Sequence, residues 1–220
     1  MTGFEPHPNL VFGDSNRIFE FVKGPIVSES KEEKRARLIE VAIAVLGRQG
    51  IRKTNLDDIA KAAGVATTSL YYYFPNKNEL VRAALSSMVD TLLAEVEAVV
   101  HSSLDPEAKL IGSWKTLFSN TKRSGLLTNL DAMAKSEVLH LTEDLVENAN
   151  HRFTVLIQEV LEEGQATGVF QVKDMETTAM VLSVGVLGLL VNTAGKAQFD
   201  LIERQIQEFG NLVMNGLKKR

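Results

Sequence analysis

Residues 54–82, TNLDDIAKAAGVATTSLYYYFPNKNELVR, decide the fold of this chain. Asn55 is a favourable N-cap residue for a short helix that follows it directly. We expect Gly64 to end this helix, because glycine adopts the left-handed conformation without strain. A second short helix is predicted over residues 67–74, and Pro75 then breaks it. Two short helices joined by a tight turn that contains glycine are typical of helix-turn-helix DNA-binding motifs.

The second of these predicted helices carries side chains that suit DNA better than plain solvent. Hydroxyl groups and aromatic rings can contact base edges, thymine methyl groups and phosphates. The residues concerned are Thr67, Thr68, Ser69, Tyr71, Tyr72 and Tyr73. We rank Tyr72 ahead of Tyr71 as a base contact, because Tyr71 could instead pack between the two helices.

Over residues 34–82 the sequence resembles the TetR family of bacterial transcriptional regulators. The resemblance rests on the order and spacing of Gly50, Thr54, Asp58, Ile59, Ala60, Ala63, Gly64, Val65, Leu70, Tyr71, Tyr73, Phe74, Lys77 and Leu80. It implies that Thr54 lies among the DNA contacts and that Tyr73 and Lys77 hold phosphates. Ala66 stands where the family usually has a serine or threonine N-cap. Thr67 is the alternative cap, and its use would shift the register of base contacts by one residue.

The positive charge of the chain is concentrated around this motif. Residues 28–82 hold ten Lys and Arg against seven Asp and Glu, while the rest of the chain holds 14 against 21. A mildly basic module on an acidic body fits DNA contact at one end only. The basic residues that precede the motif, Lys31, Lys34, Arg35 and Arg37, are either a solvated face or an arm that contacts DNA phosphates.

The sequence predicts an all-α fold, because no segment alternates apolar and polar residues convincingly with the period of a strand. Predicted helices outside the motif cover residues 31–49, 76–102, 106–124, 126–139, 142–166, 174–193 and 200–218. We divide the chain into an N-terminal extension (1–30), a three-helix helix-turn-helix DNA-binding domain (31–82) and a C-terminal helical effector-binding and dimerisation domain (83–220). The extension is either a flexible tail or contains one amphipathic helix over residues 14–23.

The C-terminal domain has more helices than a dimer platform requires. The family resemblance implies a homodimer formed through the last two helices, and a small apolar or amphipathic effector bound between the others. Apolar residues from several helices could line such a pocket: Met88, Leu92, Trp114, Phe118, Met133, Leu139, Phe153 and Leu156. Each of them, taken singly, could equally be an ordinary core residue. Few basic residues are available to face a pocket, which favours a neutral or weakly acidic effector.

Several other classes of protein are disfavoured by the composition. The absence of cysteine excludes disulfides and thiolate metal sites. The most apolar run, residues 179–191, is shorter than the roughly 20 residues that a membrane span needs, and no secretory signal is recognisable. We expect a cytoplasmic protein that needs no cofactor. Glu143, Glu147 and His151 share one face of a helix, but we interpret them as surface residues rather than metal ligands.

These features predict a homodimeric, sequence-specific DNA-binding transcriptional regulator, most simply a repressor that a small effector releases from its operator DNA. An alternative is a DNA-binding dimer without a small-molecule effector, controlled by a protein partner or by abundance. A catalytic role is not expected, since neither a nucleophile with its base nor a phosphate-binding loop is discernible.

Overall fold

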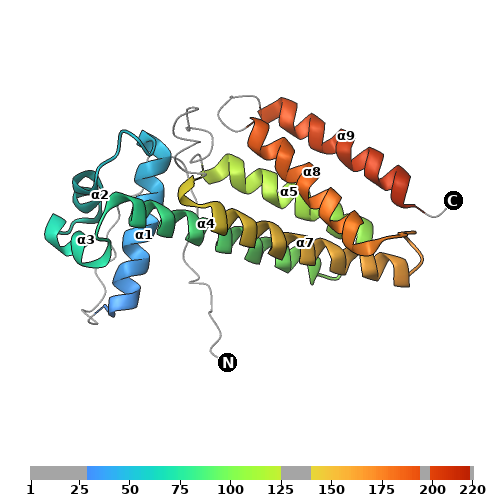
Figure 1. Ribbon diagram of the computed structural model, residues 1–220, viewed down its shortest axis with the longest axis horizontal. Coiled ribbons are helices and arrows are strands. Elements are labelled where there is room, and N and C mark those ends of the chain that lie inside the picture. The colour runs from blue at the N-terminus through green and yellow to red at the C-terminus, as the bar shows by residue number, and fades with distance from the viewer. Residues whose placement is uncertain (1–28, 125–139, 194–198, 219–220) are drawn as a thin grey trace.

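The computed structural model describes residues 29–124, 140–193 and 199–218 of the chain. The described helices are α1 (Lys31–Gln49), α2 (Leu56–Ala63), α3 (Thr67–Tyr73), α4 (Lys77–Val100), α5 (Pro106–Ser124), α7 (Glu143–Ala166), α8 (Met175–Thr193) and α9 (Phe199–Leu217). We call residues 31–85 the head and the described residues that follow them the body. Figure 1 shows the head at one end of an elongated molecule, with α4 running from the head into the body.

The head is held together by its own apolar core. Leu38 and Leu46 of α1, Ile59 of α2, Leu70 of α3 and Leu80 of α4 are buried in one cluster. Helices of eight and seven residues, such as α2 and α3, are not stable alone in water, so packing of their apolar faces must hold them. The core therefore fixes where α3 stands relative to α1 and α2.

Local caps set the ends of α2 as predicted. The Asn55 side chain accepts a hydrogen bond from the backbone N–H of Asp58 (2.8 Å), and the Asp58 carboxylate accepts one from the N–H of Asn55 (3.0 Å). Gly64 takes the left-handed conformation, with a φ of 66°. Thr67 does not serve as the alternative cap of α3: Ala66 has the extended backbone of an N-cap, and the helix begins at Thr67 without a side-chain cap.

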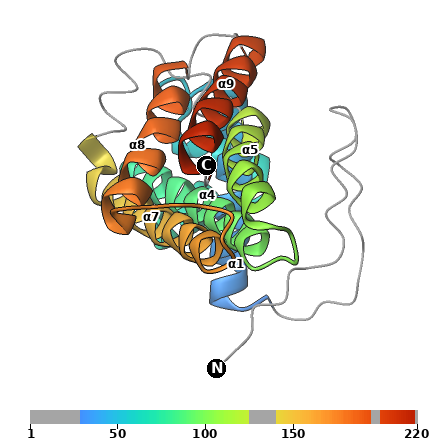
Figure 2. The same cartoon turned by 90° about the vertical axis from the view of Figure 1, so that its right-hand side faces the viewer.

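The body is a helical bundle with a second apolar core. Seen along the molecule in Figure 2, α4, α5 and α7 pack together, and α8 and α9 lie over them. Trp114, Phe153 and Val186 are buried in this core. Along α4, Leu85 belongs to the head core and Leu93 belongs to the body core. A single helix therefore runs from one core into the other.

The helix bounds predicted from the sequence agree with the structure to within about two residues wherever both can be compared. The helices predicted over residues 14–23 and 126–139 lie outside the described residues. None of the helices in the described ranges is long and apolar enough to cross a membrane. Within the same ranges, no group of three potential ligands could hold a metal ion, and Glu143, Glu147 and His151 are exposed on α7.

Candidate nucleic-acid interface

Helix α3 has an inner face and an outer face. Leu70 and Phe74, at the end of the helix, are buried in the head core. On the outer face Tyr72 is 69% exposed and Tyr71 is 51% exposed, and Thr68 is exposed as well. The helix sequence, TTSLYYY, contains no charged residue. The outer face therefore offers a partner only hydroxyl groups and aromatic rings.

Positive charge reaches this outer face from α1. The Lys31 ammonium lies 5.1 Å from the centre of the Tyr72 ring, and the Tyr73 ring meets the Tyr72 ring edge-on at a centroid distance of 5.1 Å. The Arg35 guanidinium lies 5.1 Å from the centre of the Phe74 ring. Cation–π contacts at the surface, such as that of Lys31 with Tyr72, contribute about 0.5–1 kcal/mol. They bias these two cations toward α3 without fixing them there.

Arg37 behaves differently from the basic residues that precede it. Its guanidinium donates to the Glu29 carboxylate (2.8 Å) and to the carbonyl of Ala63 at the end of α2 (3.1 Å). The hydrogen bond from Arg37 lowers the pKa of the Glu29 carboxyl below its ordinary value. Arg37 therefore ties α1 to α2, a role that the sequence did not reveal because its partners lie in separate segments.

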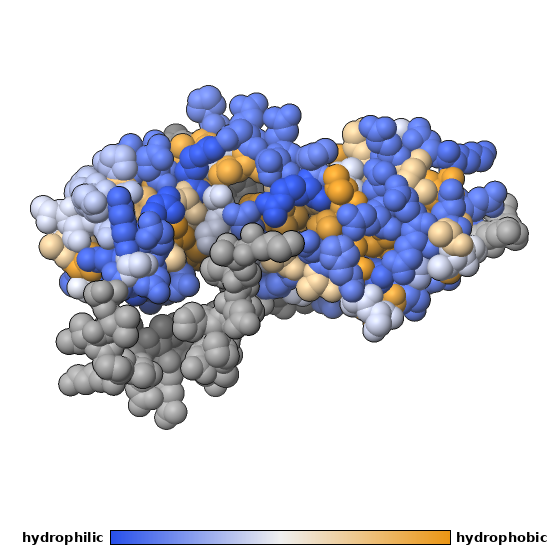
Figure 3. Space-filling model, turned by 90° about the horizontal axis from the view of Figure 1, so that it is seen from below, coloured by the Kyte–Doolittle hydropathy of each residue, from blue (hydrophilic) through white to orange (hydrophobic). Residues whose placement is uncertain are grey.

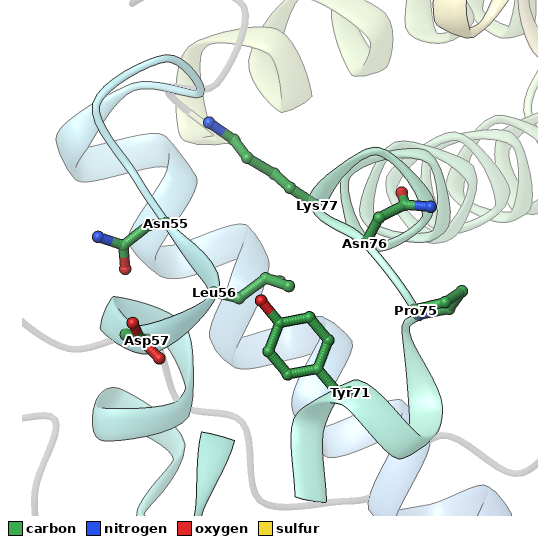
Figure 4. Close-up of a pocket in the computed structure, with 7 residues that line it drawn as sticks. All are labelled: Asn55, Leu56, Asp57, Tyr71, Pro75, Asn76 and Lys77. Atoms are coloured by element: carbon green, nitrogen blue, oxygen red, sulfur yellow. The ribbon is translucent and has the colours of Figure 1, made fainter. Parts of the chain in front are cut away.

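A hollow of about 330 Å³ opens between the starts of α2 and α4. Its lining consists of Asn55, Leu56, Asp57, Tyr71, Pro75, Asn76 and Lys77 (Figure 4). The Tyr71 side chain extends from α3 toward Leu56 at the start of α2, so it partly fills the space between α3 and α2. Lys77 occupies the first turn of α4, beside the Asn76 cap, whose side chain accepts a hydrogen bond from the N–H of Glu79 (2.9 Å). A lysine at a helix N-terminus attracts anions, and a DNA phosphate is such an anion.

Thr54 does not lie where a DNA contact is expected. The residue is only 2% exposed, and its hydroxyl donates a hydrogen bond to the carbonyl of Gly50 (2.9 Å). This bond closes the turn between α1 and α2 and uses the hydroxyl inside the head. We therefore assign Thr54 to the turn rather than to the outer surface. Thr67, Ser69, Tyr73 and Lys77 are half-buried and keep part of their side chains at the surface.

The residues predicted to line an effector pocket fall into two cores. Those in the body core or packed against it are Leu92, Trp114, Phe118, Phe153 and Leu156. Met88 packs instead against the head core, because it lies on α4 just beyond the last buried residue of the head, Leu85. Met133 and Leu139 lie outside the described residues. Met88 therefore does not lie with the other described residues that were predicted to line the effector pocket.

Trp114 stands at the centre of the body core. The residue is fully buried, and its ring centroid lies 5.2 Å from that of Phe209 on α9. Within the described parts of the chain its indole N–H has no hydrogen-bond partner, and neither do the Ser183 hydroxyl or the Gln205 side-chain oxygen. An unpaired buried polar group costs about 1–3 kcal/mol. A bound water or ligand with complementary groups would therefore stabilise this region.

Helices α8 and α9 leave apolar side chains at the surface. Met180, Val181 and Val184 of α8 and Leu212 of α9 are each more than half exposed. Glu176 is the only charged residue of α8, and a helix that is apolar on all sides is normally buried on all sides. The face seen from below in Figure 3, away from α8 and α9, is mainly hydrophilic, with hydrophobic residues showing in patches between the hydrophilic ones.

Comparison with known proteins places these features in a family. Residues 38–84 match the sequence profile described as "Bacterial regulatory proteins, tetR family". The HTH-type transcriptional repressor KstR2 of Rhodococcus jostii is 32% identical over 129 residues, which are 59% of each chain. The alignments with the first three KstR2 relatives span between 46% and 59% of the length of those proteins. The protein named "Probable HTH-type transcriptional regulator ArpR" of Pseudomonas putida is 30% identical over 181 residues, covering 74% of this chain and 80% of ArpR.

Solved structures share the fold. A TetR transcription regulator from Haloarcula marismortui matches with a TM-score of 0.73 and 17% identity, covering 86% of this chain and all of that one. The ketosteroid transcriptional regulator KstR2 of Mycobacterium tuberculosis matches with a TM-score of 0.57 and 22% identity, covering 88% of this chain and all of that one. The profile match on the helix-turn-helix and the 30% identity over four fifths of ArpR show that the chain belongs to the TetR family of bacterial regulatory proteins.

Proposed function

We propose that this protein is a DNA-binding transcriptional repressor in which α3 is the recognition helix. The observation that carries the proposal is the uncharged outer face of α3, where Tyr72 and Thr68 are exposed. Lys31 lies against Tyr72, and Lys77 lines the same hollow as Tyr71. Hydroxyl and aromatic groups suit base edges in the major groove, while lysines suit the phosphates beside it.

The repressor is proposed to act as a homodimer through α8 and α9. The exposed apolar side chains of Met180, Val181, Val184 and Leu212 support this interface, because permanent dimer interfaces are more apolar than ordinary surface. A second copy of the chain presents the same patch, so a two-fold dimer would cover it on both copies. The two recognition helices would then enter successive major grooves when they stand about 34–36 Å apart.

A small apolar or amphipathic effector is proposed to bind in the body in contact with Trp114. Ligand sites are mostly apolar with a few polar groups that orient the ligand. The apolar surroundings of Trp114 and its unpaired indole N–H support such a site. An effector with a carbonyl or hydroxyl oxygen would pair with this N–H. If it binds better to a conformation with the wrong head spacing, it releases the DNA by population shift.

Selection of duplexes from a random-sequence pool tests DNA recognition. The full chain is incubated with the pool, bound duplexes are amplified, and the cycle is repeated. We expect a two-fold symmetric sequence to be enriched, with half-sites one helical turn apart. The selected duplex should bind at least about 10³-fold more tightly than a scrambled duplex of the same composition. An unenriched pool after repeated cycles would contradict the proposal.

Mass spectrometry of small molecules that copurify with the protein tests the effector. A compound recovered in this way should weaken binding to the selected duplex when it is added back, and it should change the fluorescence of Trp114, the only tryptophan. Trp114→Phe should shift the affinity for that compound and leave the affinity for the duplex nearly intact. If this substitution lowers stability and leaves the compound's affinity unchanged, Trp114 is an ordinary core residue.

A further inference from the structure

The start of α7 touches the head, although α7 belongs to the body. Leu141 lies two residues before α7 and packs against the apolar core of the head. The rest of α7 packs on α4, α5 and α8 within the body. Leu141 therefore makes an apolar contact between head and body that is separate from the continuous helix α4.

Arg82 of α4 holds the same place by hydrogen bonds. One terminal nitrogen of its guanidinium donates to the carbonyl of Leu141 (2.8 Å) and to the Asp144 carboxylate (2.8 Å). The other terminal nitrogen donates to the second oxygen of that carboxylate. The hydrogen bond from Arg82 lowers the pKa of the Asp144 carboxyl below its ordinary value. A bidentate pair of this kind fixes orientation as well as distance.

A second ion pair between the same two helices offers a natural comparison. Arg152 of α7 donates to the Asp90 carboxylate of α4 (2.8 Å). Asp90 lies on α4 beyond Leu85, the last buried residue of the head core. Asp90 and Asp144 are both well exposed, with 60% and 68% of their side chains accessible. The two ion pairs differ chiefly in their surroundings. The Arg82–Asp144 pair lies beside Leu141, which packs against the head core, whereas the Arg152–Asp90 pair lies farther along α4, within the body.

We infer that Arg82, Leu141 and Asp144 position the head on the body and thereby set the distance between the two recognition helices of the dimer. This inference rests on the proposed function. Exposed ion pairs contribute little to stability, so we expect the cluster to affect the orientation of the head rather than the stability of the fold. It holds the head end of α4 against the start of α7. Any change in the body that moves the start of α7 is then passed to the head. Loosening the cluster lets each head reach a displaced half-site.

The test compares half-site spacings on the selected duplex. Affinities are measured for that duplex and for one with a single base pair inserted between the half-sites, using the full chain. The wild-type protein should bind the inserted duplex much more weakly, because its heads are held at one spacing. The quantity compared is the affinity for the selected duplex divided by the affinity for the inserted duplex. In Asp144→Asn and in Leu141→Ala, this ratio should fall by about 2- to 30-fold. Leu141→Met, which keeps the side-chain volume, should retain the wild-type ratio.

Asp90→Asn is the matched control. It removes the same charge from a similarly exposed ion pair between α4 and α7, so it reproduces any general electrostatic effect on DNA binding. Its affinity ratio should equal that of the wild type. The inference is overturned if Asp144→Asn and Leu141→Ala keep the wild-type ratio, or if Asp90→Asn lowers it as much. A wild-type protein that selects no duplex, or no paired half-sites, would instead contradict the proposed function.

Discussion

Tyr72 is the most exposed aromatic side chain on α3. We therefore expect it to contribute most to the recognition of DNA sequence by this helix. Tyr72→Ala should cost about 1–3 kcal/mol of binding free energy on the selected duplex and little on a random duplex. The reason is that base contacts specify sequence, whereas phosphate contacts supply general affinity. Fluorescence anisotropy titrations on both duplexes measure the two losses.

Tyr72→Phe separates the two parts of the side chain, because it removes only the hydroxyl and keeps the ring that contacts Lys31. A loss confined to the selected duplex in this variant would assign the reading to the hydroxyl. Equal losses on both duplexes after Tyr72→Ala would show that Tyr72 does not read the sequence.

Lys77 is expected to hold a phosphate at the start of α4. Lys77→Ala should weaken binding to all duplexes alike, and it should reduce the slope of log affinity against log salt by about one. Titrations of the selected and random duplexes at several salt concentrations measure this slope. Lys173→Ala, an exposed lysine beside the start of α8, should leave the slope unchanged. If the Lys77 variant also keeps the wild-type slope, the lysine is ordinary solvated surface.

Neighbouring residues show how far such roles can be predicted. The cap at Asn55 follows from local rules, because both of its hydrogen-bond partners lie within three residues. Thr54 is adjacent, yet its hydroxyl turns inward to Gly50. A threonine looks the same in sequence whether it faces DNA or closes a turn. The burial of Thr54 in the folded head decides for the turn.

At the scale of elements, helix ends were predictable and helix partners were not. Asp105 and Asp174 stand directly before α5 and α8, and each accepts a hydrogen bond from a backbone N–H three residues later, as the local rule for N-caps requires. The contact of Phe209 with Gly185 joins two different helices, and a Cβ added at Gly185 would lie 2.9 Å from the Phe209 ring. No periodicity or local rule specifies such a pair.

Helix α7 offers a test of one close contact. Gly164 lies near its end, and an added Cβ would overlap the ring of Phe170. Alanine normally stabilises a helix by up to about 1 kcal/mol relative to glycine. Here the clash should dominate, so Gly164→Ala should lower the free energy of unfolding by about 1–3 kcal/mol. Urea unfolding followed by the fluorescence of Trp114 measures this change.

Gly216 of α9 provides the comparison, because a Cβ added there meets no atom within 4 Å in the described part of the chain. Gly216→Ala should be neutral or slightly stabilising. A Gly164→Ala protein that is as stable as Gly216→Ala would show that Phe170 can move aside at little cost.

At the scale of the whole molecule, α8 and α9 expose apolar side chains that no other described part of the same chain covers. Phe209 is a poor place to test the dimer, because it packs on Trp114 and Gly185 within its own chain. Val184 is 60% exposed, so Val184→Glu should leave the fold intact. The variant should be monomeric in sedimentation velocity, because the glutamate would be buried without a partner in the interface. It should also lose most of its affinity for the selected duplex.

Val155→Glu is the matched control, since Val155 is an exposed valine of α7 and lies outside the proposed interface. This variant should remain dimeric and bind the duplex normally. If the Val184→Glu protein stays dimeric, the dimer interface does not include this part of α8.

The most direct test of a dimeric repressor that reads DNA with α3 is a hydroxyl-radical footprint of the full chain on its selected duplex. We expect two protected patches related by two-fold symmetry, with centres about 10–10.5 base pairs apart or a multiple of that distance. The protection should disappear on a scrambled duplex at the same protein concentration. A single protected patch, or equal protection of both duplexes, would contradict the account.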